Sequence, residues 1–187
     1  MKISYKLTHL KDGTPVTIRP ARPADFPLLE EMYDRLSTRS LYNRYLYTHK
    51  PGIDEIKPLC NIAPERGMAF VAVVYEPTEH IIGITHYIIE HKRPVVIAEP
   101  CFLIEDKYQG LGLGTKLSKH LSEYAIACGV ERFHTLVHSG NTAMIRAFRK
   151  GGYPITGNHS YGTWEAEITL VPETETEARY MEADRAY

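Results

Sequence analysis

The feature that most constrains this chain is a glycine-rich segment between two apolar runs of different period. Residues 109–115 read Gln-Gly-Leu-Gly-Leu-Gly-Thr. A β-rich run, 95–104, precedes them, and apolar residues at helical spacing follow until Gly129, where the helix is expected to end. Glycines at such a turn let backbone N–H groups converge, and the helix N-terminus adds partial positive charge. The segment therefore predicts a phosphate-binding loop, with a plain strand-to-helix turn as the alternative.

The spacing of the glycines separates this loop from two other phosphate-binding motifs. A P-loop requires Gly-Lys-Ser/Thr after four intervening residues, and a dinucleotide fingerprint requires Gly-x-Gly-x-x-Gly. Neither register fits, because Thr115 and Leu117 stand where those motifs need glycine. The loop also follows successive strands rather than opening a repeated βαβ series. These differences favour another phosphate ligand.

The remaining pattern predicts a mixed α/β (α+β) fold. Three β-rich runs, 68–76, 81–91 and 95–104, are joined by short connections, as in an antiparallel meander. Their order in the chain predicts a mainly antiparallel central sheet flanked by helices. Further strands are expected at 5–10, 16–19, 132–138 and 164–171, and helices at 25–36 with Asp25 as the cap, 54–61, 113–128 and 142–150.

Length, charge and cysteine usage limit the functions available. At 187 residues the chain fits one domain, with an N-terminal strand or hairpin extension (1–15) and an acidic tail (172–187) around residues 16–171. The 22 basic and 23 acidic side chains nearly cancel, so neither nucleic acid nor a membrane is expected as a partner. The first ten residues match neither a signal peptide nor a spanning helix. We expect a cytoplasmic protein whose cysteines, Cys60, Cys101 and Cys128, are core or near-core thiols.

At the glycine loop the sequence resembles the GCN5-related N-acetyltransferase (GNAT) superfamily, whose signature is Gln/Arg-x-x-Gly-x-Gly/Ala. Gln109, Gly112 and Gly114 match this signature, and the family order extends over roughly 14–153. The resemblance implies a GNAT-like fold with the loop between strand 4 and helix 3, and makes 16–171 the N-acetyltransferase domain. The stretches Ser40-Leu-Tyr-Asn-Arg-Tyr45, Met68-Ala-Phe-Val-Ala-Val73 and Asn141-Thr-Ala-Met144 are similar to the acetyltransferase module of bacterial protein-lysine acetyltransferases.

The same resemblance implies acetyl-CoA as the acyl donor and no metal. Backbone N–H groups of the loop would hold the pyrophosphate, and the backbone near Leu103 and Ile104 would pair with the pantetheine arm. Asn141 matches a position that commonly touches this arm, although an ordinary helix cap is its alternative role. The residues expected to bind the acyl donor are Leu103, Ile104, Gln109, Gly110, Leu111, Gly112, Leu113, Gly114, Thr115 and Asn141.

Acyl transfer to an amine requires a base, because a lysine amine with a pKa of about 10.4 is almost wholly protonated at pH 7. Glu99 is the candidate, since it is a carboxylate in an otherwise apolar strand, where burial would raise its pKa toward a useful value. The similar modules also carry a glutamate at this position. A structural ion pair with an arginine is the competing interpretation. Pro100 removes a ladder donor beside it and predicts a bulge or a splay.

Other groups have weaker cases. The family tyrosine that protonates the leaving thiolate corresponds to Phe148, which leaves Tyr153 and Tyr161 as substitutes. An acyl-cysteine at Cys101 is conceivable, but direct attack needs none. The histidines His134 and His138 share a strand face, but no further ligand completes a metal site. In the family, the region that holds the cluster Tyr42, Arg44, Tyr45, Tyr47 and His49 borders the acceptor site.

These features predict an N-acetyltransferase that moves an acetyl group from acetyl-CoA to a primary amine by direct attack in a ternary complex. A protein lysine is the leading acceptor and a small-molecule amine the second. A non-catalytic acyl-CoA sensor would keep the glycine loop and be indifferent to Glu99→Gln, and a pure interaction domain would have no acyl-CoA affinity to lose. A homodimer is compatible with all of these functions.

Overall fold

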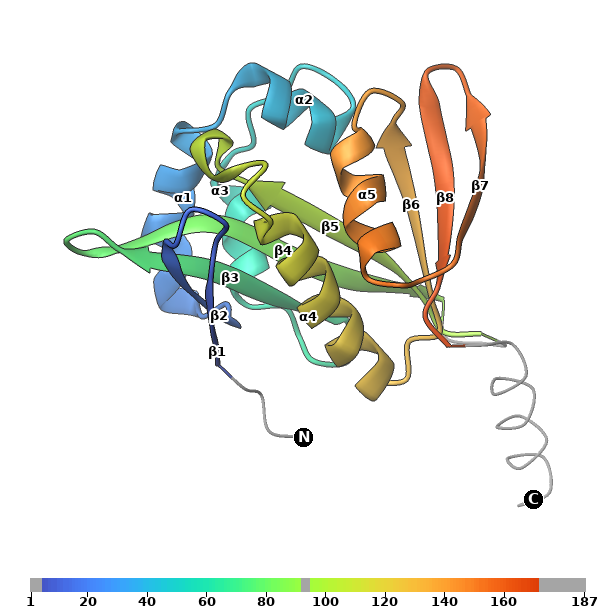
Figure 1. The fold of residues 1–187 in the computed structure, drawn as a ribbon, viewed down its shortest axis with the longest axis horizontal. Coiled ribbons are helices and arrows are strands. Elements are labelled where there is room, and N and C mark those ends of the chain that lie inside the picture. The colour runs from blue at the N-terminus through green and yellow to red at the C-terminus, as the bar shows by residue number, and fades with distance from the viewer. Residues whose placement is uncertain (1–4, 92–94, 172–187) are drawn as a thin grey trace.

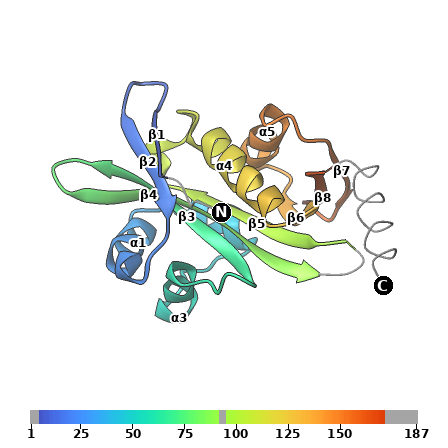
Figure 2. The ribbon, with the colours of Figure 1, turned by 90° about the horizontal axis from the view of Figure 1, so that it is seen from below.

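The computed structural model describes residues 5–91 and 95–171. They form an eight-stranded sheet with helices on both faces (Figure 1). Figure 2 shows α1 (Phe26–Asp34) and α3 (Ile53–Ile56) under one face, and α4 (Leu113–Ala127) and α5 (Thr142–Lys150) over the other. The expected mixed α/β fold is confirmed. Within the described ranges, no helix combines the length and the apolar character needed to span a bilayer.

The sheet has the strand order β1-β2-β3-β4-β5-β6-β8-β7. Every neighbouring pair is antiparallel except β5 and β6, which are parallel because the chain passes through the glycine loop and α4 between them. The expected meander corresponds to β3, β4 and β5. The strands are β1 (Lys6–His9), β2 (Pro15–Pro20), β3 (Gly67–Tyr75), β4 (Glu79–His91), β5 (Ile97–Ile104), β6 (Arg132–His138), β7 (Ile155–Ser160) and β8 (Thr163–Thr169).

The glycine loop lies between β5 and α4 in this chain. These are strand 4 and helix 3 of the expected order when β1 and the one-turn α3 are left out of the count. The N-terminal strands β1 and β2 pair with each other and continue the same sheet through β3. The sheet therefore includes the N-terminal strands β1 and β2.

Apolar residues on both faces of the central strands form two packed layers. On β3, Val71 and Val73 pack with residues of α1 and α3, whereas Ala72 and Val74 belong to the layer beneath α4. Because β3 is covered on both faces, its sequence is a continuous apolar run rather than an alternating one. Burial of these two layers positions α4 and the loop that precedes it.

Two elements were not expected from the sequence. Helix α2 (Thr38–Tyr45) lacks an apolar stripe and begins where the Ser37 side chain accepts a hydrogen bond from the Ser40 N–H at 3.2 Å. Strand β7 is an exposed edge strand of mostly polar residues, and its pairing with β8 gives it its structure. Tertiary contacts, rather than local periodicity, determine both elements.

Several expectations about single residues are wrong. Asp25 is the N-cap residue of α1, as expected, but its buried carboxylate pairs with Arg19 and makes no capping bond to this helix. It also ends a short 3-10 segment, Pro23–Asp25. Cys128 is exposed at the end of α4, unlike Cys60 and Cys101, which are buried as expected. The helix expected at 54–61 is instead a single α-turn followed by a 3-10 segment, Lys57–Cys60. The tail 172–187 and the connection 92–94 lie outside the described residues.

Candidate functional site

The glycine loop has the geometry of an anion site. Gly110 and Gly112 have φ angles of +75° and +90°, in the left-handed region that favours glycine. Gly112 is the N-cap of α4 and provides no capping side chain. The first N–H groups of a helix have no acceptor within the helix. The backbone N–H groups of Leu113, Gly114 and Thr115 are therefore donors for an anion at the N-terminus of α4.

Gln109 braces this loop from within the protein. Its side-chain amide donates to the carbonyl of Ile104 at 2.9 Å and to the Ser40 hydroxyl at 3.0 Å. Both amide hydrogens are thus used between the end of β5 and α2. Asp106 strengthens the link, because its carboxylate accepts from the Ser37 and Ser40 hydroxyls at 2.6 Å and 2.9 Å. No sequence pattern predicted this network, because Ser37 and Ser40 lie more than 60 residues from Asp106 and Gln109.

Beside the loop, β5 and β6 pair at only two positions and then diverge. The last pair joins Ala98 to Phe133, and no strand of the described chain pairs with the β6-facing edge of β5 beyond it. Pro100, two residues later, lacks the N–H that a continued ladder would need. The pairing of β5 with β4 continues without interruption across Pro100. The predicted splay is therefore confirmed, and the alternative of a bulge at Pro100 is wrong.

The opening between β5 and β6 collects several of the candidate residues. Leu103 packs toward α1 and α3, whereas Ile104 packs toward α4. Their side chains thus occupy the two faces of the sheet, and their backbone lies along the edge of β5 that faces the opening. A Cβ at Gly114 would lie 3.5 Å from Ile104 Cδ1 and 4.0 Å from Ala147 of α5. Asn141 precedes α5, and its side chain makes no capping bond. Asn141 therefore does not act as an ordinary side-chain cap.

Glu99 is the first residue of β5 beyond the pairing with β6. Contrary to the expectation of burial, its side chain is exposed. Ala98 and Phe102 pack in the layer under α4 and α5, so alternation directs Glu99 to the opposite face. His134 of β6 lies on that face too, where it meets Glu90 at 3.5 Å and Glu165 at 2.9 Å. No ion pair within 4.0 Å joins Glu99 to an arginine within the described ranges, although the charge of Arg44 on α2 interacts with this carboxylate.

A buried polar cluster lies next to Glu99 under α2. Cys101 stands opposite His86 in the register of β5 and β4, and Arg44 of α2 interacts with both. Burial raises the pKa of the Cys101 thiol, although the Arg44 charge opposes this shift. Burial, together with the Arg44 charge, lowers the pKa of His86 to about 3. A neutral thiol of this kind is a poor nucleophile, which argues against an acyl-cysteine.

His86 makes the stability of the protein depend on pH. Its folded-state pKa of about 3 lies below the ordinary value of 6.5. Below that value, the unfolded chain binds a proton that the folded chain does not, so stability falls as the pH decreases toward 3. We expect a loss of about 2 kcal/mol at pH 5 relative to pH 7 from this group. Urea unfolding should show a smaller loss over that interval for His86→Gln, and equal losses would contradict the burial of a neutral imidazole.

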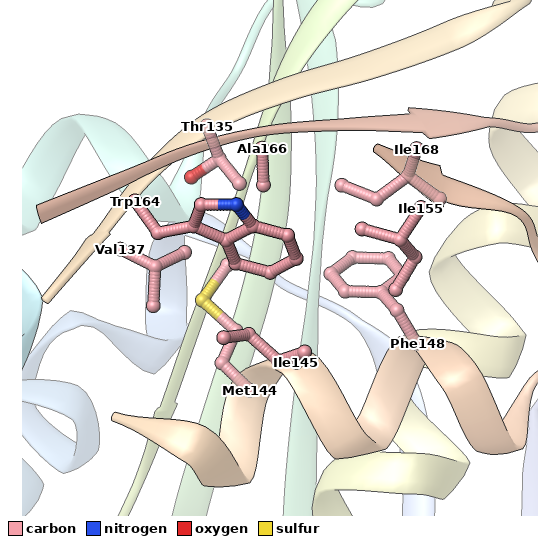
Figure 3. A pocket seen from close by; sticks show the side chains of 9 residues that line it. All are labelled: Thr135, Val137, Met144, Ile145, Phe148, Ile155, Trp164, Ala166 and Ile168. Atoms are coloured by element: carbon pink, nitrogen blue, oxygen red, sulfur yellow. The ribbon is translucent and has the colours of Figure 1, made fainter. Parts of the chain in front are cut away.

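The three positions considered for a general acid, Phe148, Tyr153 and Tyr161, lie in different parts of the structure. Phe148 is buried against Phe102 and Phe133, and it helps to line a small apolar cavity of about 10 Å³ between α5, β6 and β8 (Figure 3). That space holds at most about one water molecule, so it is a packing gap and no ligand site. Tyr161 is fully exposed at the β7–β8 turn. Tyr153 contacts Ser122 of α4.

The histidines of β6 also have separate partners. His138 packs edge-on against the Tyr42 ring of α2, with centroids 5.4 Å apart, and its Nδ1 accepts the Gly140 N–H. This contact joins α2 to the far side of the opening. Across residues 5–91 and 95–171, no group of three or more His, Cys, Asp or Glu side chains could hold a metal ion.

Comparison with known proteins gives one family. The model described as "Acetyltransferase (GNAT) family" matches residues 29–153. Acetyltransferase PA5475 of Pseudomonas aeruginosa is 33% identical over 137 residues, which are 72% of this chain and 73% of that protein. The GNAT domain of S. lividans PAT superposes with a TM-score of 0.78 at 23% identity, covering 88% of this chain and 96% of that one. Salmonella typhimurium yncA with its cofactor acetyl-CoA has a TM-score of 0.63 at 20% identity, covering 82% and 90%.

Proposed function

The chain belongs to the acetyltransferase (GNAT) family and is an acyl-CoA-dependent N-acetyltransferase, and from this premise we propose that it acetylates lysine side chains of proteins with Glu99 as the general base. The observation that carries the proposal is the position of Glu99. This carboxylate is exposed at the point where β5 and β6 separate, on the face opposite α4. An acyl donor that enters from the α4 side would present its thioester to an acceptor arriving on the Glu99 side.

The acyl donor is acetyl-CoA. In our proposal its pyrophosphate accepts hydrogen bonds from the first N–H groups of α4 and from the loop around Gly110 and Gly112. The pantetheine arm then extends along the unpaired edge of β5 toward Cys101, in the place that a neighbouring strand would otherwise occupy. Gln109 contributes by holding Ile104 and the loop in place rather than by contacting phosphate.

The proposed chemistry begins with proton transfer. Glu99 accepts a proton from the protonated acceptor amine, directly or through one water molecule, and so makes the nitrogen nucleophilic. The nitrogen attacks the thioester carbonyl carbon, the C–N bond forms, and the C–S bond breaks. The second proton, which the nitrogen loses as the amide forms, passes to solvent. Phe148 cannot donate a proton to the departing sulfur. A thiol has a pKa of about 8.5, close to neutrality, so sulfur can leave as thiolate without a dedicated acid.

The surroundings of Glu99 favour a cationic acceptor. Glu90 and Glu165 share its face of the sheet, where both contact His134 of β6. A lysine side chain is long and positively charged, so the carboxylates would attract it before deprotonation. The site is also open to solvent on this face, which suits a residue on the surface of a folded protein.

The test compares acceptors directly. Purified protein and acetyl-CoA should release free thiol with lysine-containing peptides, and mass spectrometry should locate the acetyl group on the lysine side chain. Peptides with arginine in place of lysine serve as the control. Turnover with small amines alone would replace the protein acceptor by a small-molecule one. Acetyl-CoA binding without turnover on any amine would favour a sensor.

Replacement of Gly112 by alanine tests the loop. A Cβ at this position has room, since its nearest neighbours are Lys11 carbons at 3.7 Å and 3.8 Å, but the φ of +90° is strained for alanine. We expect about a tenfold increase in the Kd for acetyl-CoA because the converging N–H groups are displaced. Gly129→Ala is the matched control, since Gly129 has a φ of +84° and open space at the other end of α4. Similar changes in affinity for both variants would contradict the assignment.

A further inference from the structure

The turn between β1 and β2 lies against the glycine loop. The Lys11 N–H donates to the carbonyl of Leu111 at 3.0 Å. The aliphatic part of the Lys11 side chain covers Gly112, since its Cγ and Cε lie 3.7 Å and 3.8 Å from the place that a Cβ would take. This turn precedes the residues 29–153 that match the family model. A segment outside the matched domain therefore brings a cation to the N-terminus of α4.

The turn holds Lys11 in a defined place. The Leu10 N–H donates to Thr14 O at 2.9 Å, and the Gly13 N–H donates to Leu10 O at 3.0 Å. Asp12, the only carboxylate in the turn, accepts the Thr14 N–H at 3.0 Å and so is engaged within the turn. The Lys11 side chain is exposed, and no ion pair involves it within the described ranges. Its ammonium group, one bond beyond Cε, is available to an anionic ligand.

We propose that Lys11 is a phosphate ligand of the acyl donor and contacts the pyrophosphate at the N-terminus of α4. The inference rests on the loop site proposed above and extends it to a residue more than 90 positions away in sequence. A helix N-terminus carries about half a unit of positive charge, less than a pyrophosphate requires. A lysine ammonium supplies a full charge with three rotatable donors. Lys11 thus contributes affinity for the donor and takes no part in the chemistry.

The test measures binding of two donors to wild type and to three variants. Acetyl-CoA and S-acetylpantetheine share the thioester, but only the first carries the pyrophosphate. For Lys11→Met we expect about a tenfold increase in the Kd for acetyl-CoA at low salt and no change for S-acetylpantetheine. The kcat at saturating acetyl-CoA should stay unchanged. Lys11→Arg should retain most of the affinity. Lys119→Met, on the exposed side of α4 beside Glu123, is the matched control and should bind both donors as wild type does.

The outcomes separate this inference from the proposed function. If wild type binds no acetyl-CoA, the loop site itself fails. If wild type binds but Lys11→Met binds equally well, or loses both donors equally, Lys11 is no phosphate ligand and at most shapes the loop. Acetyl-CoA without its 3′-phosphate should show the same penalty. A penalty that vanishes with this donor would overturn the assignment to the pyrophosphate.

Discussion

Glu99→Gln should lower the kcat for lysine acetylation by about 10²- to 10⁴-fold while leaving the Kd for acetyl-CoA unchanged. Glutamine keeps the size and exposure of the side chain but cannot accept the proton that the acceptor amine must lose. Thiol release measures the rate, and calorimetric titration measures the affinity in the same samples. Because Glu99 is exposed at the edge of the opening, the substitution should not disturb the fold.

Glu165→Gln is the control for this experiment. Glu165 is an exposed carboxylate on the same sheet face, but it lies on β8 and contacts His134 rather than the opening. We expect its variant to keep the wild-type kcat within about threefold, since it alters only the local charge. A Glu99→Gln enzyme that is equally active would assign the base to another group or to solvent.

Asp25→Ala should lower the free energy of unfolding by about 3–5 kcal/mol. Arg19 and Asp25 are both buried, and two parallel hydrogen bonds of 2.7 Å and 2.8 Å join them. Among the residues that the structure describes, removal of the carboxylate leaves the buried guanidinium with the partly exposed Glu79 as its one charged partner, at 2.5 Å. Urea unfolding followed by circular dichroism measures the loss.

The double variant Arg19→Met with Asp25→Leu tests whether an apolar pair at these two buried positions is as stable as the ion pair. A buried ion pair replaced on both sides by apolar groups of similar volume is often neutral in stability. We therefore expect this variant to recover most of the stability that Asp25→Ala loses. A loss below about 1 kcal/mol in the single variant would mean that water reaches Arg19.

The expectations about this fold succeeded where a single local pattern decided the structure. Helix α4 has apolar residues at helical spacing over four turns, so its identity follows from periodicity alone. The elements that were missed have no such pattern. Helix α2 buries only Ser40 and depends on Asp106, more than 60 residues away, for its attachment. An interaction of that range leaves no periodic trace in the sequence.

The environment expected for Glu99 was wrong, because its side chain is exposed. The apolar neighbours of Glu99 in sequence indicated burial, yet Ala98 and Phe102 pack on the opposite face of β5. The pairing with β6 ends at Ala98, which leaves the Glu99 side chain at an open edge. Local composition therefore predicted a strand but not the solvent exposure of one of its side chains.

The sequence by itself determined the glycine loop, the helix that follows it and the proline that ends the pairing of β5 with β6, because each is a property of a few adjacent backbone torsions and donors. Only the tertiary structure decided that Gln109 braces the loop, that Asp25 neutralises Arg19 and that Lys11 lies on Gly112. These contacts join residues through the packing of separate elements. Their partners are chosen by the positions of strands and helices in space, which no short stretch of sequence specifies.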